Sequence, residues 1–160
     1  MSSSEKSLHT PLKDLMPLIR ERIAQGQSVR FYPQGVSMLP MLRPGMDSVE
    51  LSAPPVRLKK YDLPLYQRKD GAYVLHRVIK VGQTYTCAGD NQFRYEPGLE
   101  HGQVIAVVTA FYRGDQRHSV RTPAYRLYCR FWHAYRKIRH LWLRLKRKLR
   151  RLINRLPKER

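Results

Sequence analysis

The amino-acid sequence predicts a mainly β fold of the α+β class, with one helix before the β region and a long basic helix after it. Two observations carry this prediction. Between residues 28 and 113, short apolar or alternating runs follow one another closely and are separated by Gly and Pro turns, which is typical of antiparallel strands. After residue 123, apolar residues recur every three or four positions, which is typical of a helix. The 160 residues have room for one modest domain with appendages.

Three segments are therefore expected. Residues 1–27 form an N-terminal helical segment, in which Thr10 and Pro11 supply a cap and a first-turn proline. Residues 28–113 form the β-domain. Residues 114–160 form a linker and a basic amphipathic helix.

Six strands are expected within the β-domain. They lie at residues 29–32, 47–52, 63–68, 73–81, 84–87 and 104–112. Asp70 and Gly71, between the third and fourth strands, are typical of a tight hairpin turn. Strands so closely spaced predict a coiled β-sheet or a partly open barrel.

A serine and a histidine in this region supply a candidate nucleophile and a candidate base. Ser37 lies between Gly35 and Pro40, two residues that favour a tight turn displaying the serine. A serine hydroxyl needs a neighbouring base to take its proton and donors to hold the oxyanion that forms. His76, in an alternating run, titrates near neutrality and fits the role of base. Taken separately, each residue is more often an ordinary turn serine or core histidine.

Four short motifs follow one another along the β-domain. They are Gly-x-Ser-Met-x-Pro at 35–40, Pro-Gly-Met-Asp-Ser-Val at 44–49, His-Arg-Val-Ile at 76–79 and Gly-Asp-Asn at 89–91. In this order they resemble the superfamily of signal peptidase I and LexA-type serine peptidases, particularly its small bacterial members without a membrane anchor. The resemblance implies that fold and the hydrolysis of a peptide bond. It also implies a Ser37–His76 pair, where many relatives use lysine as the base.

The resemblance further implies an acid in the Gly-Asp-Asn motif and a second acid six residues beyond it. These positions hold Asp90 and Glu96. Ser37 would attack the scissile carbonyl, His76 would take its proton, and one of the two acids would orient the imidazole. The sequence leaves the choice of acid open, and Asp90 is equally suited to a turn. Activity should rise with pH through a midpoint within a unit or so of ~6.5, the ordinary pKa of histidine.

The residues that bind the oxyanion are less defined. Gly35 and Met38 flank the nucleophile, so backbone amides of this turn are the candidate donors. No cofactor and no metal are expected, because Cys87 and Cys129 are the only cysteines and neither has a partner at metal-ligand spacing. The N-terminus lacks the apolar core of a secretory signal, so a cytoplasmic location is expected.

The C-terminal segment is strongly basic. Residues 124–160 hold 14 Lys and Arg but one Glu, out of a net charge of +19 for the whole chain. An apolar stripe that includes Trp132 and Trp142 is expected to enter an anionic membrane surface, at the inner face of the membrane. The basic residues beside it include Arg144, Lys146, Arg147 and Lys148. Nucleic acid is a less favoured partner, and packing on the β-domain or on a second copy is the structural alternative.

Two functions from different classes fit these features. The first is a serine endopeptidase that cleaves an extended peptide or protein segment of unknown sequence. The second is a non-catalytic or weakly active module that binds a membrane surface and retains the peptidase fold. A LexA-type self-cleaving regulator fits less well, because no DNA-binding domain precedes the β-domain. Deletion of residues 124–160 should leave the serine site reactive, unless the helix covers apolar surface of the β-domain.

Overall fold

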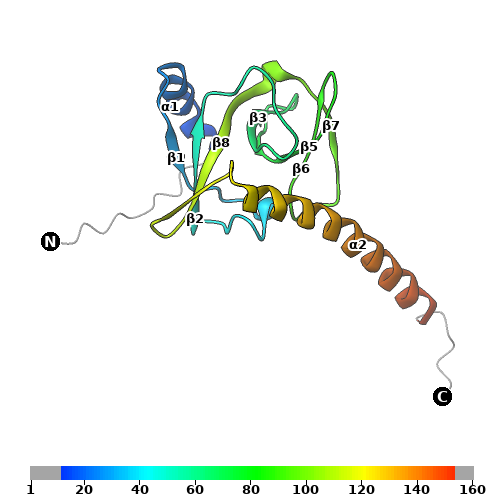
Figure 1. Ribbon diagram of the computed structural model, residues 1–160. Helices are drawn as coiled ribbons and strands as arrows, with labels where there is room; N and C mark the ends of the chain where they lie inside the picture. The colour runs from blue at the N-terminus through cyan, green and yellow to red at the C-terminus, as the bar shows by residue number, and fades with distance from the viewer. Residues whose placement is uncertain (1–11, 154–160) are drawn as a thin grey trace.

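The computed structural model, which describes residues 12–153, confirms a mainly β protein with two antiparallel sheets and two helices (Figure 1). In the last part of the second helix, only some side chains are described. The strands of the larger sheet follow the order β1 (Val29–Phe31), β2 (Asp47–Ser52), β8 (Val104–Arg113), β3 (Pro64–Gln67) and β4 (Tyr73–Leu75), with β9 (Gln116–Ser119) also paired to β8. The smaller sheet has the order β5 (Arg77–Val81), β6 (Tyr85–Ala88) and β7 (Glu96–Leu99).

Most strands lie where the sequence predicts them. The hairpin at Asp70 and Gly71 is confirmed, since β3 and β4 pair antiparallel and Gly71 has a φ of +85°. The run at 73–81 divides at His76 into β4 and β5, which belong to different sheets. β7 and β9 were not expected from the sequence. β7 contains a proline and a glycine, both of which are uncommon in strands.

Helix α1 (Leu12–Ala24) covers one side of the larger sheet. Met16 and Ile19, three residues apart, are 2% and 1% exposed and join the core that this sheet shares with both helices. Pro17 removes one backbone hydrogen bond without ending the helix. Thr10 and Pro11, expected to begin the helix, lie outside the described residues.

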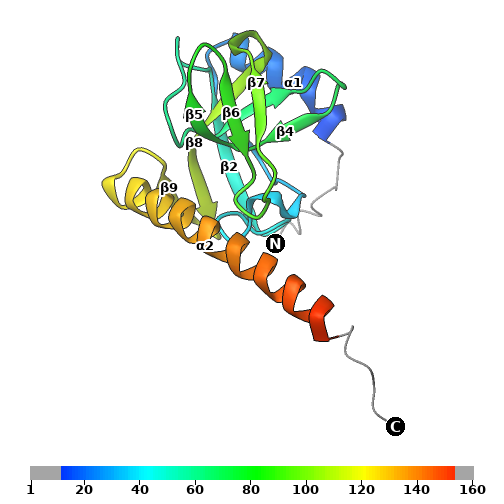
Figure 2. The same cartoon turned by 90° about the vertical axis from the view of Figure 1, so that its right-hand side faces the viewer.

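Helix α2 (Pro123–Ile153) runs along the end of the β-domain opposite α1 and then extends past it (Figures 1 and 2). Thr122 caps its first turn, accepting a hydrogen bond from the Tyr125 amide at 3.2 Å. Tyr125 and Cys129 are buried in the same core as α1. The first part of α2 therefore packs on the β-domain, which is one of the alternatives to membrane binding that the sequence left open.

Candidate functional site

Ser37 lies in a single 3-10 turn, η1 (Val36–Met38), which follows β1 after a short loop. Met38 anchors the turn, because its side chain is 2% exposed and belongs to the main core. Gly35 precedes the turn with φ −80° and ψ 151°, an extended conformation that any residue adopts. The turn therefore does not require the conformational freedom of glycine at position 35, contrary to the sequence expectation.

The Gly-Asp-Asn motif packs directly against this turn. The Asn91 amide donates a hydrogen bond to the Ser37 carbonyl at 2.8 Å, and the Asn91 side chain donates one to the Val36 carbonyl at 3.3 Å. A Cβ added to Gly89 would lie 2.7 Å from the Ser37 carbonyl oxygen. Glycine is therefore needed at position 89 to let the two backbone segments approach.

The same approach brings Ser37 and His76 together. The Cβ of Ser37 and Nε2 of His76 each lie 3.1 Å from the position that a Gly89 Cβ would take. These two atoms are therefore no more than twice that distance apart. In the part of the chain that the structure describes, no direct hydrogen bond joins the two side chains, and such bonds often tighten only when substrate binds.

Glu96, at the start of β7, is the acid beside the imidazole. Its Oε1 lies 3.4 Å from Nδ1 of His76, on the opposite side of the ring from the atom that faces Ser37. Tyr66 donates a hydrogen bond to this carboxylate at 2.6 Å, and Arg68 holds both of its oxygens. Tyr66 and Arg68 were not among the residues expected at the site.

The environment keeps the imidazole neutral and the carboxylate charged. Burial lowers the pKa of His76 to about 4, and the nearby Glu96 only partly opposes this effect. Burial tends to raise the pKa of Glu96, but hydrogen bonds from Arg68 and Tyr66 bring it below its ordinary value. A carboxylate beside Nδ1 favours the tautomer with its proton there. Nε2, which faces Ser37, is then left as a proton acceptor.

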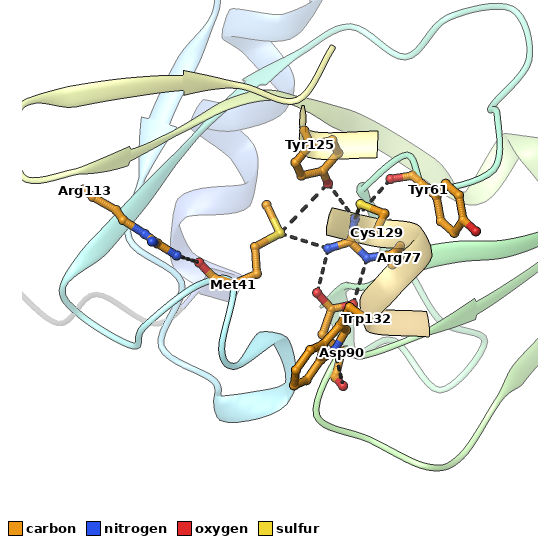
Figure 3. A network of polar contacts seen from close by, with 8 residues as sticks. All are labelled: Met41, Tyr61, Arg77, Asp90, Arg113, Tyr125, Cys129 and Trp132. Atoms are coloured by element: carbon orange, nitrogen blue, oxygen red, sulfur yellow. Dashed lines mark hydrogen bonds and ion pairs between the residues drawn. The ribbon is translucent and has the colours of Figure 1, made fainter. Parts of the chain in front are cut away.

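Asp90 occupies a different position. Its carboxylate accepts two hydrogen bonds from the Arg77 guanidinium, at 2.7 and 2.6 Å, and both side chains are almost fully buried (Figure 3). The structure thus brings Ser37, His76 and Glu96 into one constellation. Asp90 lies behind it, joining the Gly-Asp-Asn motif to the strand that follows His76.

Residues of α2 complete the surroundings of Arg77. Its Nη1 donates to the hydroxyl of Tyr125 at 2.6 Å and to Sγ of Cys129 at 2.9 Å (Figure 3). One turn farther along the helix, the indole N–H of Trp132 donates to the Asp90 carbonyl at 3.0 Å. The sequence predicts that Trp132 enters a lipid surface, but its indole N–H bonds to the Asp90 carbonyl, behind Ser37, His76 and Glu96.

A second face of α2 remains exposed. Its large apolar side chains recur at helical spacing and are each more than half exposed: Leu127, Phe131, Tyr135, Ile138, Trp142 and Leu145. Lys146 lies beside them, with Nζ 3.6 Å from the centre of the Trp142 ring. The side chains of Arg144, Arg147 and Lys148 lie outside the described part of the structure. The helix therefore presents a docked face and a separate apolar face, whereas the sequence predicted one stripe.

A cavity of about 400 Å³ opens beside Ser37 and His76. Apolar side chains from α1, β1 and β4 form much of its wall: Leu12, Leu15, Phe31, Tyr73 and Leu75. Such a cavity fits an apolar side chain next to Ser37 and His76. Within residues 12–153, no cluster of three His, Cys, Asp or Glu side chains is placed to hold a metal ion. Neither described helix has an apolar stretch long enough to span a bilayer.

The low pKa of His76 sets the expected pH dependence of the site. Reaction of Ser37 with a fluorophosphonate should be nearly independent of pH from about 5 to 8 and should fall below that range, with a midpoint at about 4. Since the folded pKa lies below the ordinary value of about 6.5, protonation also costs stability as pH falls between these values. Labelling rates from pH 3.5 to 8, with circular dichroism as the control for folding, check this. The lowered pKa of His76 replaces the midpoint near 6.5 expected from the sequence, and a measured midpoint near 6.5 would mean a solvated imidazole.

The close approach at Gly89 gives a second prediction. Gly89→Ala should lower the labelling rate of Ser37 by about 100-fold, because an added methyl group would push the serine turn away from His76. Gly102→Ala is the matched control, since a Cβ there meets no atom within 4 Å. Equal labelling of the two variants would contradict the packing described for residue 89.

The comparisons with known proteins add no relative to this description. No protein-family model, curated protein or solved structure matches the chain.

Proposed function

We propose that this protein is a serine endopeptidase of the signal peptidase and LexA-like type, with Ser37 as nucleophile, His76 as base and Glu96 as the residue that orients His76. The observation that carries the proposal is the position of one neighbour on each side of the His76 imidazole. Nδ1 lies 3.4 Å from a charged carboxylate, and Nε2 lies against the serine turn. These positions have the order of a serine, histidine and acid triad. Among the described residues Nδ1 makes no hydrogen bond, so the contact with Glu96 would shorten when the site becomes reactive.

The reaction follows from these positions. Ser37 Oγ would attack the carbonyl carbon of the scissile bond while its proton moves to Nε2 of His76. The same proton would pass to the leaving amine as the C–N bond breaks, which gives an acyl-enzyme. Water would then hydrolyse the ester with His76 again acting as base. Glu96 would stabilise the imidazolium that forms in each half of the reaction. Backbone amides of the turn at Gly35, Ser37 and Met38 are the candidate donors to the oxyanion.

The larger sheet supports an extended substrate. β1 and β4 stand at its two ends, and residues of both strands line the cavity beside Ser37. Residues of the two edge strands therefore lie beside the same cavity. An edge strand offers unpaired backbone groups to an extended peptide, and the cavity would take one of its apolar side chains.

The test of this function is covalent labelling. Wild-type protein incubated with a fluorophosphonate at pH 7 should gain the mass of one adduct, found by peptide mapping on Ser37, while Ser37→Ala should gain none. Ser48→Ala serves as a control, because Ser48 is fully buried beside Arg30 and away from the cavity. Absence of labelling on wild type would refute the activated serine and favour a non-catalytic module.

The exposed face of α2 favours a second role, peripheral binding to an anionic membrane. Six large apolar side chains lie uncovered on this face, and 14 Lys and Arg occur between residues 124 and 160. Apolar side chains enter the boundary of the acyl chains while each basic residue near the surface adds about 1 kcal/mol. The two roles are compatible, since the site and this face lie on different sides of the helix.

The membrane role predicts separable effects of charge and apolar area. Deletion of residues 146–160, which removes eight Lys and Arg and one Glu, should weaken binding to anionic vesicles at low salt. Replacing Phe131, Ile138 and Trp142 together with serine should instead remove the binding that persists at ~1 M salt, where the Debye length is about 3 Å. Both variants keep the docked residues of α2 and should still react with the serine probe. Equal binding of wild type to neutral and anionic vesicles would contradict the role of charge.

A further inference from the structure

One short loop joins the two halves of the candidate site. Asn91 holds the backbone of the serine turn through hydrogen bonds to Val36 and Ser37, and Glu96 lies beside His76. The residues between them, 92–95, have no regular secondary structure. The position of this loop therefore decides how the serine turn and the orienting acid are placed relative to each other.

Two arginines of α2 hold the loop from outside. Nη1 of Arg139 donates to Oδ1 of Asn91 at 3.2 Å, and its guanidinium carbon lies 5.4 Å from the centre of the Phe93 ring. One turn earlier, the guanidinium of Arg136 lies 4.7 Å from the centre of the Tyr95 ring. Cations at such distances are attracted by the face of an aromatic ring, most strongly where water is excluded.

Arg136 is placed there at a cost. It is 5% exposed, and among the described residues its Nη2 has no hydrogen-bond acceptor. Burial of a guanidinium that lacks hydrogen-bond acceptors is unfavourable. Arg136 therefore does not lie against the loop because its charge is better solvated there. A lysine or arginine on the outer side of α2 would stay in water without this cost.

We propose that Arg136 and Arg139 are positioning residues for the Ser37, His76 and Glu96 site, because they fix the loop that connects Asn91 to Glu96. The inference rests on the proposed peptidase function. It makes the first half of α2, up to residue 139, part of the catalytic unit. It also replaces the sequence expectation that removing residues 124–160 would leave the site reactive.

The experiment measures the loop and the serine separately. Arg136→Gln and Arg139→Gln are compared with Arg130→Gln, which removes the same charge from an exposed position of the same helix. Hydrogen exchange at the Asn91 and Gln92 amides, which bond to Ser37 and Gly89, should become about 10-fold faster in the first two variants only. Labelling of Ser37 should slow by about 10- to 100-fold in the same two variants. Arg139→Lys should recover part of both effects, since it retains a cation near Phe93.

A pH profile separates positioning from a general loss of stability. The charged groups that act on His76 are Glu96, Arg68, Asp90 and Arg136, and the cations among them lower its pKa. Arg136→Gln should therefore raise the pH midpoint of labelling, whereas Arg139→Gln should lower the rate without moving the midpoint. The proposal would be overturned if Arg136→Gln left the midpoint unchanged and if the slower labelling of both variants matched a loss of stability measured by urea unfolding.

The outcomes distinguish this proposal from the function beneath it. Unchanged exchange and labelling in both variants, with wild type reactive, would overturn the positioning role and leave the peptidase intact. If wild type does not react with the probe but hydrogen exchange is faster in the variants, the proposed peptidase function would be wrong. The arginines would then stabilise the loop without a role in catalysis, which would overturn the positioning proposal as well.

Discussion

Replacing His76 with alanine should slow the reaction of Ser37 by about 10²- to 10⁴-fold at pH 7, which is the usual contribution of a positioned general base. The neutral imidazole is the group near Ser37 that can accept its proton, because Glu96 is held by Arg68 and Tyr66 on the far side of the ring. The measurement is the second-order rate of fluorophosphonate labelling, followed by intact mass.

The matched control is His118→Ala. His118 stacks on Phe111 in the larger sheet, with ring centres 5.0 Å apart, and it does not line the cavity beside Ser37. This variant should label at the wild-type rate. His76→Ala that labels as fast as wild type, with an unchanged unfolding transition, would show that another group activates Ser37.

The largest effect on stability is expected at Asp90. Asp90→Asn should lower the free energy of unfolding by about 3–5 kcal/mol, because it leaves the Arg77 guanidinium buried without its charged partner. Urea unfolding followed by tryptophan fluorescence measures the change, and Trp132 reports on the place where α2 meets Asp90.

A double variant identifies the cause of that loss. Arg77→Met combined with Asp90→Asn removes the unpaired charge and should recover a large part of the lost stability. Asp70→Asn, at an exposed hairpin turn, is the control for the carboxylate itself and should change the free energy of unfolding by less than about 0.5 kcal/mol. Asp90→Asn with wild-type stability but a shifted pH profile would instead assign Asp90 to the orientation of His76.

The sequence predicts the serine, the base and the two candidate acids because short motifs carry them. It does not decide between Asp90 and Glu96. That choice depends on β7, which its proline and glycine make hard to recognise as a strand in the sequence, and on the pairing of β7 with β6. Tyr66 and Arg68 were missed because a tyrosine and an arginine near a strand end have many ordinary roles. Only the fold brings them to the carboxylate of Glu96.

The amphipathic helix shows a second limit of sequence patterns. Periodicity detects one apolar stripe, but the docked face of α2 is made of Tyr125, Cys129, Trp132 and Arg136, a mixture that hydropathy does not separate from its neighbours. From the sequence, Arg136 is expected on a solvated basic face, and only the fold shows that it is buried against the ring of Tyr95. The exposed stripe is the part that the pattern predicts well, since it needs no partner within the chain.

The packing of α2 on the Gly-Asp-Asn motif has a consequence for when the protein becomes competent during its synthesis. The ribosome completes Ser37, His76 and Glu96 before it adds the arginines of α2 that meet the loop between them. A nascent chain released from the exit tunnel as far as β9 has Ser37, His76 and Glu96 but lacks the contacts of α2 with Asp90, Asn91 and Tyr95. If the proposed site depends on these contacts, its reactivity would arise only after α2 has been synthesised and has docked on the β-domain.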